Sequence, residues 1–290
     1  MSPVTAGTNG GVTWRVELER EWLLPGQATD GSVTVTPNKD MEIRGCVAAL
    51  IATEQWQTTE TDGKRTRTVT HTEELQRLPV VLSGPTTLVG GVERTFPLQV
   101  PVPPLGPATF EGTVIRLTWE LEIKLDRYGL DPAWYVPIGV LQPTALLKAG
   151  VVQVGEFGLY ETADVADNRL DGSVTLRPMP LCVGEVFEGS VETGGIRPSK
   201  LRAIRLELIV TAKATVSSGL EEKILVWGYA YPPDTTSPIQ ITGRLPTTCV
   251  PTIELPHGRA DATFEVIFDR AFDVDYNLVR DVTVASTTEM

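Results

Sequence analysis

Apolar and polar residues alternate with a period of two along several short stretches, among them Thr13–Leu18, Ser32–Thr36 and Thr118–Leu125. This period turns one apolar face toward a core and one polar face toward solvent, as in a half-buried antiparallel strand. Helical periodicity is scarce, and only Thr72–Leu78 and Pro143–Lys148 would suit one or two helical turns. We therefore expect an all-β fold with very little helix.

The strand pattern occurs twice in the chain. The segment GQATDGSV at 26–33 parallels GEVFEGSV at 184–191, and the same offset aligns Val16 with Val174. At a shorter offset, Trp119 aligns with Phe264, so the length difference falls between matched strands, where duplicated domains usually diverge. We expect Trp119 and Phe264 to point inward.

Many short strands separated by turn signals, repeated in order, predict two tandem antiparallel β-sandwich domains. We expect the first sandwich over residues 1–150, a connection over 151–167 and the second sandwich over 168–290. The connection is rich in Gly, Ala and acidic residues, which suits a linker.

Several of these segments resemble the arrestin fold. They are 30–37 (DGSVTVTP), 43–50 (IRGCVAAL), 96–101 (FPLQVP) and 119–121 (WEL) in the first half, and 184–191, 206–210 and 245–246 in the second. The resemblance covers nearly the whole chain and depends on the order of the segments. It is closest to the bacterial sporulation-control members of the arrestin-like family, and it implies a binding scaffold without a reaction. No Arg–Asp set matches the buried polar core of receptor arrestins, so phospho-receptor sensing is not implied.

The charge balance narrows the choice of partner. The chain of 290 residues has a formal net charge of −12 and a pI near 4.7, which argues against binding a nucleic-acid backbone. The densest basic run, Lys64, Arg65 and Arg67, is interpreted as a solvated loop tip. No uninterrupted apolar run approaches 18 residues, so we expect no membrane span.

The cysteines and the N-terminus favour a cytoplasmic protein. Cys46, Cys182 and Cys249 lie far apart and form no CxxC pair, so neither a disulfide framework nor a zinc pattern is predicted. Residues 1–14 lack the basic start and apolar run of a signal peptide.

The sequence holds no recognisable catalytic or metal-binding motif. The two histidines, His71 and His257, are not in HExxH spacing, and neither GxSxG nor a Cys–His motif occurs. Asp273–Asn277 imitates the start of a calcium loop, but Leu278 stands where that loop requires Gly. We predict no catalytic residue, no cofactor and no metal. Acidic residues in and just after the connection suit a solvated segment better than a cation site; they are Glu161, Asp164, Asp167 and Asp171.

We predict an intracellular adaptor or regulatory scaffold that binds an unidentified protein, through sheet edges or through the concave faces of its sandwiches. Self-association through edge strands is a further expectation. Aromatic residues that alternate along one strand leave two interpretations open: core or interdomain packing, which is favoured, and stacking on a partner side chain or a sugar ring. The second interpretation motivates the alternative function, a carbohydrate-binding β-sandwich protein. The candidate binding residues are Thr13, Arg15, Val16 and Glu17 in the first strand and Trp227, Tyr229 and Tyr231 in the aromatic strand.

Overall fold

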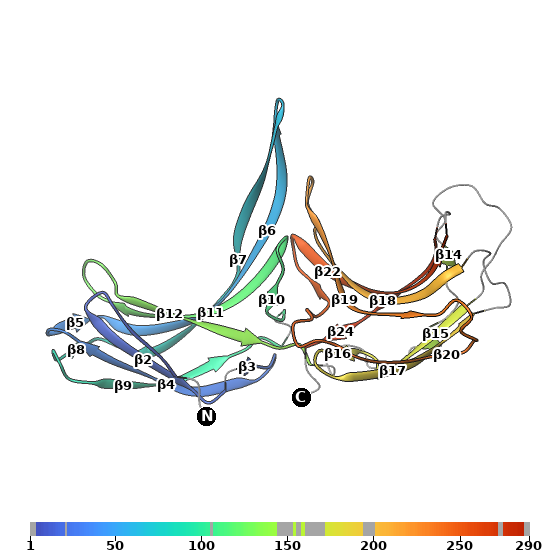
Figure 1. Cartoon of the computed structure of the whole chain (residues 1–290). Coiled ribbons are helices and arrows are strands. Elements are labelled where there is room, and N and C mark those ends of the chain that lie inside the picture. Colours follow the sequence, from blue (N-terminus) through green and yellow to red (C-terminus); the bar gives the residue numbers. More distant parts are fainter. Residues whose placement is uncertain are drawn as a thin grey trace. The chain divides into compact units, whose positions relative to one another are not determined.

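The computed structural model describes residues 4–20, 22–104, 107–143, 153–154, 158–159, 172–193, 201–271 and 275–286 (Figure 1). Within these ranges the chain forms no helix, and about 70% of residues lie in strands that build several sheets. The all-β prediction is confirmed. The helical turns expected at Thr72–Leu78 are wrong, because this segment lies inside a long strand, and most of Pro143–Lys148 falls outside the described residues.

The described residues of the first half form twelve strands. They are β1 (Val4–Asn9), β2 (Val12–Leu18), β3 (Trp22–Leu23), β4 (Ala28–Pro37), β5 (Met41–Ile43), β6 (Gly45–Asp62), β7 (Arg65–Ser83), β8 (Thr86–Leu88), β9 (Arg94–Pro101), β10 (Phe110–Glu111), β11 (Ile115–Asp126) and β12 (Ala133–Val140). The second half contains β13 (Gln153–Val154), β14 (Gly158–Leu159), β15 (Gly172–Arg177), β16 (Leu181–Cys182), β17 (Val186–Thr193), β18 (Leu201–Ala214), β19 (Glu221–Tyr231), β20 (Ile239–Arg244), β21 (Ile253–Glu254), β22 (Gly258–Arg270), β23 (Tyr276–Val282) and β24 (Val284–Ala285).

The two halves share one strand order. In the first half, the four-stranded sheet runs β1-β2-β4-β9 and the six-stranded sheet contains β3-β12-β11-β6-β7, with β10 beside β11. In the second half, the corresponding orders are β13-β15-β17-β20 and β14-β23-β22-β18-β19, with β21 beside β22. Most strands of one set therefore have a counterpart in the other, as the duplicated sequence pattern predicts. The exceptions are β3, which follows β2 and pairs in parallel with β12, and β14, which precedes β15 and pairs antiparallel with β23.

The repeated Gly motif has the same physical basis in both halves. Gly26 and Gly184 both have a φ of +78°, a backbone conformation that residues other than Gly rarely adopt. A Cβ at Gly31 would lie 2.4 Å from the carbonyl oxygen of Glu17, and a Cβ at Gly189 would lie 2.0 Å from that of Thr175. The motif thus supplies a tight turn and then a close approach between neighbouring strands.

The buried side chains alternate along the strands and give a sandwich-like fold. Phe187 on β17 of a four-stranded sheet contacts Trp227 on β19 of a six-stranded sheet, with ring centroids 5.2 Å apart. Trp119 and Phe264 are at most 1% exposed, which confirms that both point inward.

The chain divides into two compact units. One comprises Met1–Trp56, Val69–Glu111 and Arg116–Leu141, and the other comprises Gln57–Thr68, Gly112–Ile115 and Gln142–Met290. The expected connection, 151–167, contains β13 and β14, which pair with β15 and β23; its acidic residues lie outside the described part of the chain.

Candidate functional sites

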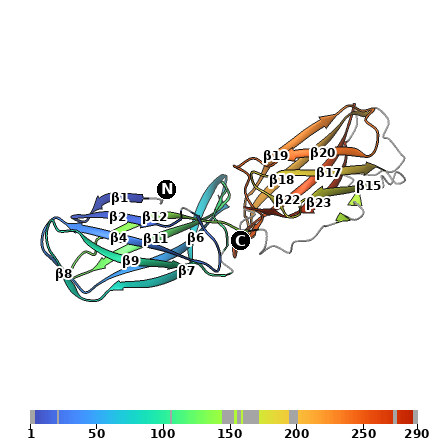
Figure 2. The ribbon, with the colours of Figure 1, turned by 90° about the horizontal axis from the view of Figure 1, so that it is seen from below.

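The first candidate segment, Thr13–Leu18, is not at a sheet edge. It forms β2, which pairs with β1 on one side and β4 on the other, as Figure 2 shows. Both rows of its backbone hydrogen-bonding groups are therefore used within the sheet. Its counterpart β15 likewise lies between β13 and β17, so neither strand offers a free edge, and binding through an edge at Thr13–Leu18 is wrong.

The side chains of β2 pack in the core or pair with one another on the exposed face of the sheet. Val16 is 1% exposed and belongs to the core, whereas Thr13 is on the opposite, exposed face. Arg15 and Glu17 form an ion pair with each other, and their side chains are 59% and 39% exposed. An exposed pair of this kind contributes little to stability.

Three of the long edge strands differ in how strongly they resist pairing with another chain. On β9, Pro97 and Pro101 lack the N–H that an added strand would need. On β7, Pro79 and several charged residues interrupt the edge. On β19, the charges are confined to Glu221–Lys223, and the stretch Ile224–Tyr231 contains neither charge nor Pro. Of these three strands, β19 is the least protected edge, which we call the β19 edge.

A bulge in β19 determines where its aromatic residues point. Leu225 pairs with Ile209 and Trp227 pairs with Leu208, so Val226 is an extra residue. Because Leu208 is fully buried, Trp227 is on the core-facing side, where it also stacks on Phe264 at 6.3 Å between centroids. Of the two interpretations of the aromatic strand, packing toward the core is therefore the right one for Trp227.

The other two aromatic residues lie beyond the core contact. Tyr231 donates its hydroxyl to the carbonyl oxygen of Gln240 on β20, at 2.8 Å. Tyr229 contacts the ring of Tyr231 with centroids 4.7 Å apart and remains 58% exposed. On the opposite face, Leu225 is 59% exposed. The β19 edge thus carries one large exposed side chain on each face of its sheet.

A second group of exposed residues, missed at the level of sequence, lies on the outer face of the six-stranded sheet of the first half. Trp22 on β3 is 49% exposed and Tyr135 on β12 is 47% exposed. Pro137, which lies on β12 between Tyr135 and the Trp22 partner Gly139, is exposed as well. A Cβ at Gly139 would lie 1.9 Å from the Trp22 ring, so the indole occupies the space that a side chain would need. We call Trp22, Tyr135 and Pro137 the aromatic face.

Charged residues beside the aromatic face form a network across three strands. Tyr135 donates its hydroxyl to Glu122 at 2.9 Å, and Arg77 donates Nη1 to the other oxygen of Glu122 at 2.6 Å. Arg77 also donates Nε and Nη2 to the two oxygens of Glu74, at 2.9 and 2.8 Å. The hydrogen bond to Glu122 raises the pKa of Tyr135, and burial and the charge of Glu120 raise it further.

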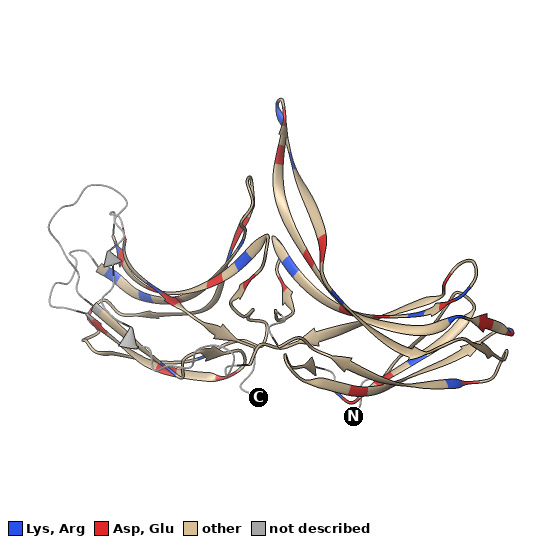
Figure 3. Cartoon of the chain, turned by 180° about the vertical axis from the view of Figure 1, so that it is seen from behind, with Lys and Arg blue, Asp and Glu red and all other residues tan. Residues whose placement is uncertain are grey.

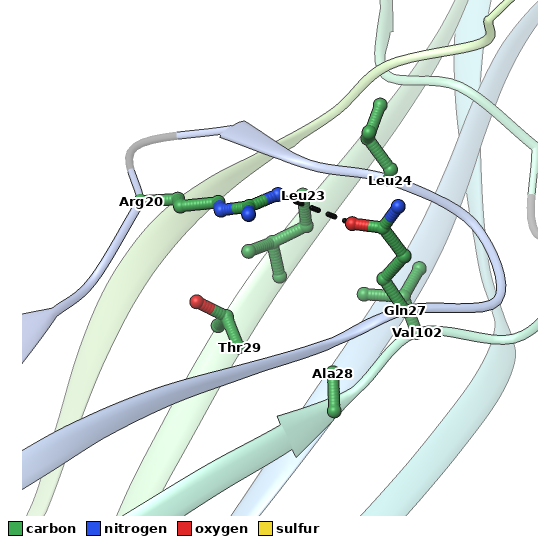
Figure 4. Close-up of a pocket in the computed structure, with 7 residues that line it drawn as sticks. All are labelled: Arg20, Leu23, Leu24, Gln27, Ala28, Thr29 and Val102. Atoms are coloured by element: carbon green, nitrogen blue, oxygen red, sulfur yellow. Dashed lines mark hydrogen bonds between the residues drawn. The ribbon is translucent and has the colours of Figure 1, made fainter. Parts of the chain in front are cut away.

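Two depressions of the described surface differ in size and in the side chains that line them. A pocket of about 10 Å³ beside Thr29 has room for a single water molecule; it is lined by Leu23, Leu24 and Val102, and Arg20 donates to Gln27 there at 3.1 Å (Figure 4). A depression of about 560 Å³ over β18, β19, β22 and β23 contains the ion pairs Arg259–Asp261, at 2.8 Å, and Lys223–Glu221, at 4.0 Å.

Across the described residues, no group of three or more His, Cys, Asp or Glu is placed to hold a metal ion. Nor do those residues include a helix that could cross a membrane. The three cysteines are free and buried, and burial raises the pKa of Cys46 to about 12 and that of Cys249 to about 11. Their thiols stay protonated, which suits core residues.

The basic run lies at the turn between β6 and β7. Figure 3 shows basic residues at the tip of this hairpin and acidic residues along it. Lys64 is in the turn, and Arg67 pairs with Glu60 at 2.7 Å. The partial neutralisation of this run agrees with its interpretation as a solvated loop tip.

No protein-family model matches the sequence, and no curated protein matches it either.

Proposed function

We propose that the chain is a non-catalytic scaffold of two tandem antiparallel β-sandwich domains of the arrestin type, and that it binds an extended segment of another protein at the β19 edge. The observation that carries the proposal is this edge, where Ile224–Tyr231 has neither charge nor Pro and, among the strands of the described residues, pairs with β18 alone. The strand order that the two halves share, β1-β2-β4-β9 with β12-β11-β6-β7 in one and β13-β15-β17-β20 with β23-β22-β18-β19 in the other, supports the tandem arrangement.

The physical argument concerns the backbone of β19. An edge strand presents a row of unpaired N–H and C=O groups, and a partner strand that pairs with them gains main-chain hydrogen bonds. Alternate side chains of the partner would then contact Leu225 on one face of the sheet and Tyr229 on the other, which are both exposed. This arrangement favours a partner segment with large apolar side chains on both faces.

A bacterial origin and a cytoplasmic location belong to the same proposal. They rest on the resemblance to the sporulation-control members and on three free, buried cysteines. The carbohydrate-binding alternative loses its motivation, because Trp227 packs against Phe187 and Phe264 and does not offer its ring to a sugar. Self-association remains a second use of the same edge.

Selection from a display library of random twelve-residue peptides tests the proposal. The selected peptides should bind the parent chain, and binding should slow amide hydrogen exchange in Ile224–Tyr231. The variant Leu225→Lys/Tyr229→Lys should bind them at least about tenfold more weakly, because a charge on an edge strand opposes pairing. The matched control is Val81→Lys, which changes a 76% exposed residue on the edge strand β7.

Equal binding by the β19 variant and the parent, without protection of Ile224–Tyr231, would refute the proposal. Sedimentation of the parent and the variant separates self-association from partner binding. A dimer that the Leu225→Lys/Tyr229→Lys variant cannot form would assign the edge to a second copy of the chain.

A further inference from the structure

We propose that the aromatic face is a second binding site, and that it takes a proline-rich segment carrying Arg or Lys. This inference is independent of the β19 edge, because it rests on other residues in the other half of the chain. It commits to one ligand chemistry, an extended polyproline II helix with a positive charge.

The pairing of β3 with β12 holds the side chains of the aromatic face in place. Trp22 lies in the short edge strand β3, which pairs in parallel with β12 through Gly139 and Val140. Gly139 has no side chain, so the Trp22 indole lies directly on the backbone of β12. Trp22 nevertheless remains 49% exposed. Val136 and Ile138 are buried on the other side of the strand, so Tyr135, Pro137 and the Trp22 ring share the outer side.

The spacing suits a short extended ligand. Tyr135 and Gly139 are four residues apart on β12, which corresponds to about 13 Å along a strand. A polyproline II helix rises about 3.1 Å per residue, so about four of its residues span this distance. Its pyrrolidine rings pack on aromatic side chains, and its backbone is ordered before binding, which lowers the entropic cost.

The charges beside the aromatic face select a basic ligand. Glu120 is exposed on β11 directly opposite Pro137, and Glu122 lies opposite Tyr135. Arg77 is the cation of the network, and it already bonds two carboxylates, Glu74 and Glu122. The nearby Lys124 is likewise paired, with Asp131 at 2.7 Å. The excess negative charge favours Arg or Lys near an aromatic ring, where a cation–π contact adds to the attraction. A neutral oligosaccharide would gain nothing from this charge.

A titration with synthetic peptides tests the inference. The probe is a labelled twelve-residue peptide of consecutive prolines with two arginines at one end. The comparison peptides replace the arginines with glutamates, or the prolines with glycine and serine. Binding is measured by fluorescence anisotropy at 50 and 300 mM salt. The indole N–H signal of Trp22, identified by its loss in Trp22→Phe, reports the site by NMR.

We expect the Arg peptide to bind, to bind more weakly at 300 mM salt, and to shift the Trp22 signal. Trp22→Ala should weaken binding about tenfold or more, as expected for an aromatic anchor. Glu120→Gln should weaken binding of the Arg peptide by about threefold and reduce its salt dependence. Gly139→Ala should also weaken binding. The new methyl group displaces the Trp22 ring from its position on β12, although residue 22 is still Trp. Thermal melting checks that each variant folds.

Three results would overturn the inference. One is the absence of binding at 1 mM Arg peptide, and another is equal binding of the Arg and Glu peptides. The third is a Trp22 signal that shifts with a neutral oligosaccharide and not with the Arg peptide. The Leu225→Lys/Tyr229→Lys variant is the control, because it should bind the Arg peptide as the parent does.

Discussion

Replacing Gly189 with Ala adds one methyl group where β17 runs close to the backbone of β15. The new Cβ would lie 2.0 Å from the carbonyl oxygen of Thr175 and 3.0 Å from a methyl carbon of Leu176. The carbonyl oxygen belongs to the backbone, so no side-chain rotation relieves the contact. Gly31→Ala makes the same change in the first half, with the new Cβ 2.4 Å from the carbonyl oxygen of Glu17.

The distances set the size of the effect. Cβ atoms in proteins essentially never approach other heavy atoms closer than 3.0 Å, so the strands must separate by about 1 Å at Gly189 and by about 0.6 Å at Gly31. Overpacking in a well-packed region costs about 1–3 kcal/mol. We expect the upper end of this range for Gly189→Ala and the lower end for Gly31→Ala. For units of this size, the two losses correspond to decreases in Tm of about 6–10 °C and 2–4 °C.

Urea unfolding followed by circular dichroism measures both variants. The two compact units can unfold separately, so a biphasic curve is fitted with two transitions. Gly84→Ala is the control in the first half, where a Cβ would meet nothing within 4 Å. Gly228→Ala is the control in the second half, where the nearest atom would lie at 3.6 Å. Both controls should change the free energy of unfolding by less than about 1 kcal/mol. If Gly189→Ala and Gly31→Ala behave like these controls, the proposed role of the repeated Gly is wrong.

Three further outcomes are expected. Trp227→Ala should lower the free energy of unfolding by about 2–3 kcal/mol, less than for a fully buried aromatic residue, and Tyr229→Ala by much less, as urea titration would show, because Trp227 is half-buried against Phe187 and Phe264. Burial, and then the charge of Glu207 on the neighbouring strand, raise the pKa of Glu265 in the folded chain. The folded chain therefore binds more protons, and its stability falls as pH rises from the unfolded pKa through the folded pKa. Glu265→Gln should raise Tm at pH 7 and leave it unchanged at about pH 3.5, where the carboxyl group is protonated in both states. Burial raises the pKa of Cys46 to about 12, so its alkylation at pH 8 should be slow in the native chain and fast in urea, measured by mass spectrometry.

Local pattern predicted the strands and their duplication, because alternation and Gly turns are properties of short segments. It did not predict which strands lie at edges. β1 consists of the weakly patterned sequence VTAGTN, yet it pairs with Val12–Glu17 along the outer edge of β2. The aromatic face was missed for a similar reason, since Trp22 reaches Gly139 from a distant part of the chain. The alternation at Ala133–Val140 was the one available signal, because it places Tyr135 and Pro137 on a single face.

The aromatic strand shows a different limit. Alternation from Trp227 to Tyr231 was visible, but the bulge at Val226 reverses which face the odd-numbered residues occupy. Lys223 and Leu225 therefore face outward, whereas Trp227 faces the core. The position of a bulge depends on the pairing of β19 with β18, so it could not be predicted from the sequence of β19 alone.

The unprotected edge at Ile224–Tyr231 also bears on the colloidal behaviour of the protein. Strands of this composition stack readily between copies when nothing holds the copies apart. A net charge of −12 supplies that separation at neutral pH through mutual repulsion. As the pH approaches the pI near 4.7, or as salt screens the charge, the repulsion fades while the edge stays uncovered. Concentrated solutions should then turn turbid, and a bound partner strand should keep them clear.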